Sequence, residues 1–75
     1  MISILGISAF YHDSAAALIQ NGEIIAAAQE ERFTRIKHDK RFPKNAIKYV
    51  LQEGKIELNN IDYVIFFGRV FLSAI

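Results

Sequence analysis

The sequence predicts an α/β fold: three strands that pair antiparallel, a crossover helix, and a fourth strand parallel to an earlier one. Asn21-Gly22 separates two apolar runs, which is the strongest short signal for a β-hairpin because both turn residues take positive φ. An apolar stripe at helical spacing follows Pro43 and leads into a last apolar run, residues 61–67. Because a helix between two strands forms a crossover, we expect the last strand to be parallel to an earlier one.

Length and composition allow a small globular core. The chain has 75 residues, 52% of them hydrophobic, and domains this short bury only roughly 60% of their unfolded surface. It has no cysteine, which rules out disulfides and thiolate metal sites and fits a reducing cytoplasm. A net charge of +1 argues neither for nor against a polyanion partner. No secretion signal is evident, and no apolar run reaches the ~20 residues that span a bilayer, so we expect a cytoplasmic protein without membrane contact.

The first strand is expected at residues 2–8. Ile2 and Ile4 point to one face, and Leu5 and Ile7 point to the other. Both faces therefore favour burial, which is typical of a central strand rather than an edge strand.

The hairpin strands are expected at residues 14–20 and 23–30. Alanine runs on both sides of the turn also have high helix propensity, but Asn21-Gly22 would break such a helix into pieces too short to be stable. We therefore prefer the hairpin. The first of these strands directly follows the polar loop that contains His12-Asp13.

A two-residue turn also fixes the register of the hairpin. Continuing from Gln20 opposite Glu23 sets Ser14 opposite Gln29, Asp13 opposite Glu30 and His12 opposite Glu31. This register brings the polar loop and the Glu30-Glu31-Arg32 cluster to the same end of the sheet.

The second half supplies a basic loop at residues 32–41, a helix at 43–54, a fourth strand at 61–67 and a tail at 68–75. The helix has an apolar stripe made by Ala46, Ile47, Val50 and Leu51. One helix covers only one face of the sheet. We therefore expect either a piece of a larger α/β domain or self-association through the bare face and the apolar tail.

His12 and Asp13 are the first candidates for a site, as a general base and its partner. The alternative is a plain turn, in which the aspartate makes local backbone bonds. The sequence alone leaves both open.

The basic loop is a second candidate, because its arginine and lysine side chains can bind phosphate. A nucleic-acid module is an alternative in a different functional class, although composition favours a solvated charged loop over nucleic-acid binding. The chain has no glycine-rich phosphate loop and no zinc-ligand spacing, so we expect no metal ligands in it.

Several segments together resemble the start of the O-carbamoyltransferases of the nodulation and antibiotic type. The resemblance extends to about Gly68 and rests on these stretches: Ile4-Leu5-Gly6-Ile7-Ser8, His12-Asp13-Ser14-Ala15-Ala16-Ala17, Asn21-Gly22-Glu23-Ile24, Ala28-Gln29-Glu30-Glu31-Arg32-Phe33-Thr34-Arg35-Ile36-Lys37-His38-Asp39 and Phe42-Pro43.

This resemblance implies part of an actin-like ATPase (ribonuclease H-like) subdomain. Such enzymes make carbamoyl-adenylate from carbamoyl phosphate and ATP, then pass the carbamoyl group to a small-molecule hydroxyl, using a divalent metal such as iron. By the resemblance, His12 lies at the transfer site and Asp13 supports it. The resemblance also implies that the loop with Arg32, Arg35, Lys37 and His38 contacts substrate or phosphate. The family's metal-binding histidines, ATP-binding loops and second domain lie beyond residue 75. We therefore expect residues 1–75 to be an N-terminal fragment without transferase activity.

Overall fold

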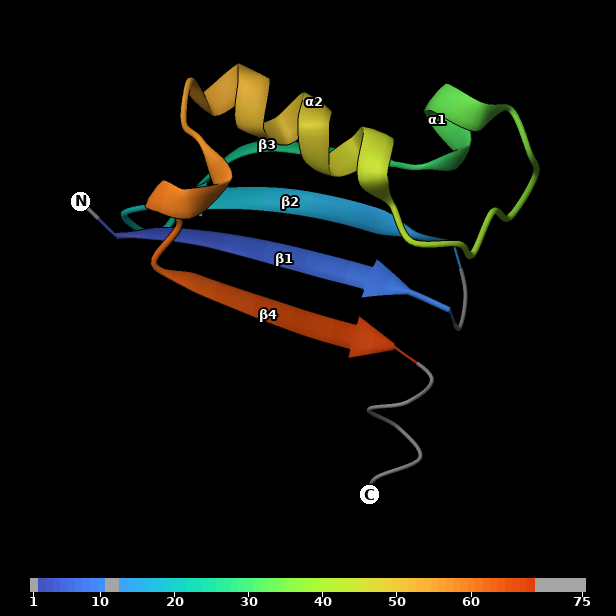
Figure 1. The fold of residues 1–75 in the computed structure, drawn as a ribbon, viewed down its shortest axis with the longest axis horizontal. Helices are drawn as coiled ribbons and strands as arrows, with labels where there is room; N and C mark the ends of the chain where they lie inside the picture. Colours follow the sequence, from blue (N-terminus) through green and yellow to red (C-terminus); the bar gives the residue numbers. More distant parts are fainter. Residues whose placement is uncertain (1, 11–12, 69–75) are drawn as a thin grey trace.

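The computed structural model describes residues 2–10 and 13–68, which form a sheet with helical segments on one face (Figure 1). His12 and the tail from residue 69 onward lie outside the described residues. The elements are β1 (Ser3–Ala9), β2 (Ala15–Gln20), β3 (Glu23–Gln29), α1 (Glu31–Thr34), α2 (Lys44–Gly54), η1 (Leu58–Asn60) and β4 (Tyr63–Gly68).

The sheet has the strand order β3-β2-β1-β4. β2 is antiparallel to both β1 and β3, and β4 is parallel to β1. The predicted fold class, including the hairpin at Asn21-Gly22, is confirmed, and both turn residues have positive φ (52° and 82°). Because β1, β3 and β4 all run in the same direction, α2 is a crossover between parallel strands.

The strands and the long helix begin and end within two residues of the predicted positions. The basic loop predicted at residues 32–41 is not wholly a loop. α1 occupies its start and ends where Arg35 takes a left-handed conformation, φ 62°. A short 3-10 turn, η1, also precedes β4, where the sequence indicated only a turn.

The hairpin register is correct near the turn and wrong beyond it. Gln20 pairs with Glu23 as predicted, but a β-bulge then inserts Ile25, so that Ala15 lies opposite Gln29. The predicted pairing of Ser14 with Gln29 is therefore shifted by one residue, and so is the predicted pairing of Asp13 with Glu30. The predicted pairing of His12 with Glu31 lies outside the described residues. A bulge restores the inward-facing pattern of the strand, which the turn signal cannot reveal.

The core lies between the sheet and α2. Leu5 and Leu18 from the sheet are buried against Ala46 and Val50 of α2, because the helical stripe meets alternate residues of β1 and β2. Gly54 ends α2 directly over Leu18, and an added Cβ there would lie 2.2 Å from the Leu18 Cδ2 atom. The last turn of the helix therefore needs a residue without a side chain.

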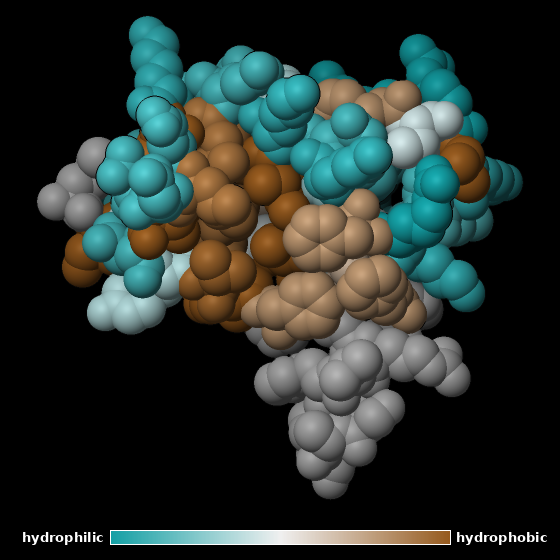
Figure 2. Space-filling view, viewed as in Figure 1, coloured by the Kyte–Doolittle hydropathy of each residue, from teal (hydrophilic) through white to brown (hydrophobic). Residues whose placement is uncertain are grey.

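α2 packs on β2 and β3, which leaves the same face of β4 less covered. Figure 2 shows apolar side chains gathered between α2 and β4. Phe10 lies between Phe42 and Phe66, with ring centroids 6.5 and 6.1 Å away. Val64 shares this face with the buried Leu5 because the two are paired, yet Val64 is exposed.

The face of the sheet opposite α2 is named the open face. Strand pairing arranges its side chains in three rows that cross the sheet. The first row is large and apolar: Tyr63, Ile4, Ile19 and Ile24. The second is mostly small: Ile65, Gly6, Ala17 and Ala27. The third contains Ser8, Ala15 and Gln29.

Candidate functional site

The end of the sheet is closed by buried polar residues from three segments. The backbone N–H of Ser14 donates to the carbonyl of Asp39, and the N–H of Glu30 donates to the carbonyl of Ser14, both at 2.8 Å. Ser14, Glu30 and Asp39 are at most 3% exposed. The Ser14 hydroxyl also donates to the carbonyl of Arg41. These bonds hold the β1–β2 loop against the segment before α2.

The sequence neighbours of these three residues meet at the surface. Asp13, Glu31 and His38 offer side-chain atoms that all lie within 4.8 Å of one another. The His38 Nδ1 atom is 2.8 Å from the Asp13 Oδ1 atom, and the His38 backbone N–H donates to Glu31 Oε1 at 2.9 Å. The hydrogen bonds that join Ser14 to Asp39 and Glu30 therefore bring together polar side chains that the sequence separates by up to 25 residues.

Asp39 holds the segment that carries His38. Its carboxylate accepts from Arg41 Nε and Nη2 at 3.0 and 2.9 Å and from the Thr34 hydroxyl at 2.7 Å. These bonds, those of Arg41 first, hold the pKa of Asp39 well below its usual range. Asp39 thus stays ionised across the physiological pH range and fixes the loop between α1 and α2.

Glu30 points inward rather than to the site. Its carboxylate accepts from the Ala46 backbone N–H at 2.8 Å and from the Asn45 side chain at 2.7 Å. These groups lie in the first turn of α2, where backbone N–H groups lack partners and a negative charge is stabilising. Glu30 therefore caps α2, and the polar cluster predicted around residues 30–32 is divided between the interior and the surface.

Asp13 and His38 form an arrangement suited to proton transfer. The Asp13 carboxylate accepts a hydrogen bond from the N–H at His38 Nδ1, which leaves Nε2 as the basic nitrogen of the ring. Glu31 holds the backbone of His38, which lies at positive φ (56°). The His38 side chain is 69% exposed, so a substrate can reach its outer nitrogen.

The same three residues are also a nitrogen and two oxygen donors, the chemistry that iron or zinc accepts. However, Asp13 Oδ1 and Glu31 Oε1 already accept hydrogen bonds from His38. A metal ion would displace the bond that orients the imidazole ring. The trio fits a hydrogen-bonded proton acceptor better than a metal centre, and no chemical step is assigned to a metal here.

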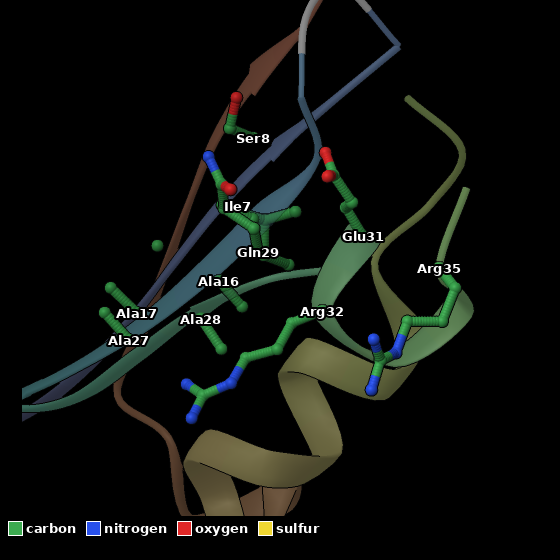
Figure 3. A pocket seen from close by; sticks show the side chains of 12 residues that line it. Ile7, Ser8, Ala16, Ala17, Ala27, Ala28, Gln29, Glu31, Arg32 and Arg35 are labelled. Carbon is green, nitrogen blue, oxygen red and sulfur yellow. The ribbon is translucent and has the colours of Figure 1, made fainter. Parts of the chain in front are cut away.

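The other predicted site residues that the structure describes are Arg32, Arg35 and Lys37. Arg32 in α1 and Arg35 just after it line a hollow of about 1060 Å³, together with Glu31 of the trio and residues of β1, β2 and β3 (Figure 3). The Arg32 guanidinium carbon also lies 5.7 Å from the centre of the Tyr49 ring. Lys37 is exposed beside His38. The predicted contacts of Arg32, Arg35 and Lys37 with substrate stay predictions, as does the role of His12.

Sequence reasoning paired Asp13 with His12 and missed its contact with His38. The hairpin register brought Glu31 to the same sheet end as Asp13, where the structure has it, but Glu31 was not named as a site residue and Asp39 was given no supporting role. The only signal for Asp39 was a carboxylate two residues before Arg41 and five after Thr34. Nothing in the sequence placed Ser14 against Asp39, which is the contact that assembles the site.

A mixed sheet with a crossover helix and a polar cluster at the carboxyl end of β1 defines a small α/β region. Comparison with known families identifies it more closely. The chain matches the family described as carbamoyltransferase N-terminus over residues 3–70. It therefore belongs to the carbamoyltransferase N-terminus family, and the resemblance inferred from the sequence is confirmed.

Curated relatives extend this match across bacteria and archaea. An uncharacterized protein of Synechocystis, sll1178, is 60% identical over 69 residues, 92% of this chain and 11% of that protein. The nodulation protein NolNO of Sinorhizobium fredii is 41% identical over 59 residues, 79% of this chain and 9% of that protein. The uncharacterized protein MJ1051 of Methanocaldococcus jannaschii is 40% identical over 53 residues, 71% of this chain and 10% of that protein. The chain thus spans about a tenth of the length of these relatives.

Within the described residues, no helix is long and apolar enough to cross a membrane. The predicted cytoplasmic location stays a prediction.

Proposed function

We propose that this chain forms one wall of the transfer site of a carbamoyltransferase, where the Asp13–His38 pair takes a proton from the hydroxyl that receives the carbamoyl group. The observation that carries this proposal is the 2.8 Å contact between His38 Nδ1 and Asp13 Oδ1 at an exposed sheet end. Membership of the family supports the class of reaction.

In this proposal the acceptor hydroxyl lies beside Nε2 of His38. As its oxygen bonds to the carbamoyl carbon, the hydroxyl proton moves to Nε2 and the bond from that carbon to the leaving phosphate oxygen breaks. The donor is carbamoyl-adenylate, which the rest of the full-length protein makes from carbamoyl phosphate and ATP, so AMP leaves. Asp13 is a positioning residue, since it acts by holding the ring in the productive tautomer.

ATP, carbamoyl phosphate and a divalent metal such as iron are assigned to the nine-tenths of the full-length relatives that lie outside this chain. The actin-like fold of the whole domain belongs to the same proposal. The strand order of this chain supports it, with three strands running in one direction and α2 as a crossover.

The test is a chimera in which residues 1–68 replace the matching region of the Synechocystis relative, assayed with labelled carbamoyl phosphate, ATP and a panel of hydroxyl compounds. We expect transfer to at least one compound. His38→Gln should lower kcat about 10²- to 10⁴-fold, the range of general base catalysis, with little change in KM.

Asp13→Asn should lower kcat as well and change its pH profile, whereas Lys55→Gln, an exposed change on the far end of α2, should have no effect on kcat. Undiminished transfer by the His38→Gln chimera would contradict the proposal, and so would the absence of transfer from an intact chimera to every compound.

A further inference from the structure

We propose that Phe10 is a positioning residue that holds Asp13 in contact with His38, through a left-handed backbone conformation and a ring packed between two other aromatic rings. The inference rests on the role that the proposed function gives to the Asp13–His38 pair. Phe10 has no polar side-chain atom, so it acts on the chemistry only through its backbone and its neighbours.

The first support is the backbone of Phe10, which directly follows β1. Its φ is 68°, in the left-handed region. A bulky side chain is rarely found in this region, because the conformation is strained and persists only where surrounding contacts hold it. Such strain clusters at functional sites, and this residue lies three positions before Asp13.

The second support is a pair of backbone hydrogen bonds that join the loop after β1 to the segment before α2 (Figure 1). The N–H of Phe10 donates to the carbonyl of Lys40 at 2.7 Å, and the N–H of Ser14 donates to the carbonyl of Asp39 at 2.8 Å. The loop carries the aspartate of the candidate site, and the segment carries its histidine. Loss of the bond at Phe10 would therefore free one end of the loop relative to the histidine.

The third support is the ring of Phe10, which packs against Phe42, just before α2, and against Phe66 on β4. The separations of the ring centroids, 6.5 and 6.1 Å, are those at which aromatic rings attract each other. A change of Phe10 to negative φ would redirect its ring and break these contacts. The ring contacts therefore stabilise the strained backbone, and the backbone in turn keeps the N–H directed at Lys40.

The test records the ring ¹⁵N signals of His38 in the free chain at pH 8, where the parent should carry a proton on Nδ1. Phe10→Ala removes the ring and leaves the strain, so it should at least halve the population of this tautomer. Phe10→Gly should retain more of the tautomer than Phe10→Ala but less than the parent, because glycine takes positive φ freely. Phe10→Tyr keeps the ring and should match the parent.

Tyr63→Ala is the matched control. It removes another exposed aromatic ring, at the opposite end of the sheet, where Tyr63 pairs with Ile4. It should leave the His38 signals in place. Circular dichroism at the same temperature shows which variants are folded, and Phe10→Gly, in which the strain is relieved, serves where Phe10→Ala does not fold.

The chimera with the Synechocystis relative gives a second measurement. Phe10→Ala should lower kcat at least tenfold, because a small displacement of a catalytic group is costly. KM should change less than twofold, since Phe10 does not bind substrate in this proposal. Phe10→Tyr should have the kcat of the parent chimera.

A folded Phe10→Ala or Phe10→Gly chain with the His38 tautomer of the parent would overturn the inference and leave the proposed function intact. An equal shift in Tyr63→Ala would also overturn it, because the effect would then come from a general loss of stability. A parent chain without the Nδ1 proton would contradict the proposed function itself, and with it the role of Phe10.

Discussion

At the scale of single residues, the polar side chains at the sheet end are of two kinds: buried ones that stabilise the fold and surface ones that form the candidate site. Ser14, Glu30 and Asp39 are buried, and their hydrogen bonds hold separate segments of the chain together. Each stands next to a residue that points to solvent, and those three neighbours compose the candidate site. A substitution at a buried member should therefore act through stability, and one at a surface member through chemistry.

Asp39, one of the buried groups, should make the stability of the chain depend on pH. Its pKa is depressed by the bonds from Arg41 and Thr34, so its contribution to stability is complete above the ordinary carboxyl range, about pH 4, and falls as the pH drops toward the lowered folded value. We expect Asp39→Asn to lower the urea midpoint at pH 7 and to flatten the loss of stability below pH 4.

The control is Glu57→Gln, which removes an exposed carboxylate and should leave the acid limb of the stability profile unchanged. Parallel acid limbs for the parent chain and Asp39→Asn would count against the assigned role of Asp39.

At the scale of elements, the two ends of α2 depend on particular residues. The start depends on Glu30, which lies outside the helix, and the end depends on Gly54, which has no side chain. Glu30, from the end of β3, supplies the carboxylate that the first turn needs. Glu30→Gln should lower the free energy of unfolding by about 2 kcal/mol, the sum of a weakened cap and a lost charged hydrogen bond.

Urea unfolding followed by circular dichroism measures this loss. Glu53→Gln makes the same chemical change on the exposed surface of α2 and should alter the free energy of unfolding by less than about 0.5 kcal/mol. Equal effects of the two substitutions would show that Glu30 is not a cap.

The end of α2 makes a second prediction. A Cβ at Gly54 would meet the buried Leu18 side chain, whereas one at Gly6 would meet its nearest neighbour, the Ala17 carbonyl oxygen, at 3.9 Å. Gly54→Ala should therefore destabilise the chain by about 1–3 kcal/mol through overpacking. Gly6→Ala should be tolerated in the free chain, and a comparison of their thermal midpoints checks this difference.

The elements also show which structural features can be predicted from the sequence and which cannot. Asn21-Gly22 predicts the hairpin because its positive φ angles are a local property. The bulge at Ile25 is decided by which side chains reach the core, and the contact of Asp13 with His38 is decided by a backbone bond between residues 25 apart, Ser14 and Asp39. Such long-range choices leave no periodic pattern, so the strands were predictable and the assembly of the site was not.

At the scale of the whole molecule, the chain is flat, 32 × 31 × 19 Å. Within the described residues, α2 covers one face of the four-stranded sheet, and the His38 side chain at the sheet end is 69% exposed. In the proposed function, the groups that bind ATP and the carbamoyl donor come from outside the described residues.

We accordingly expect the 75-residue chain alone to show no carbamoyl transfer and no ATP turnover. The measurement is release of phosphate and pyrophosphate from carbamoyl phosphate and ATP at high chain concentration, compared with a blank without the chain. Turnover that scales with the chain and disappears in His38→Gln would show that residues 1–75 form a complete site.

The central claim is that Asp13 orients His38, and the most direct measurement is the ¹⁵N spectrum of the His38 ring in the free chain at pH 8, where an ordinary histidine is neutral. The structure predicts a proton on Nδ1 and a bare Nε2. Asp13→Asn should move the proton toward Nε2, while Glu57→Gln, a change at an exposed carboxylate of another segment, should leave the His38 signals in place. Identical His38 tautomers in the parent chain and in Asp13→Asn would contradict the claim.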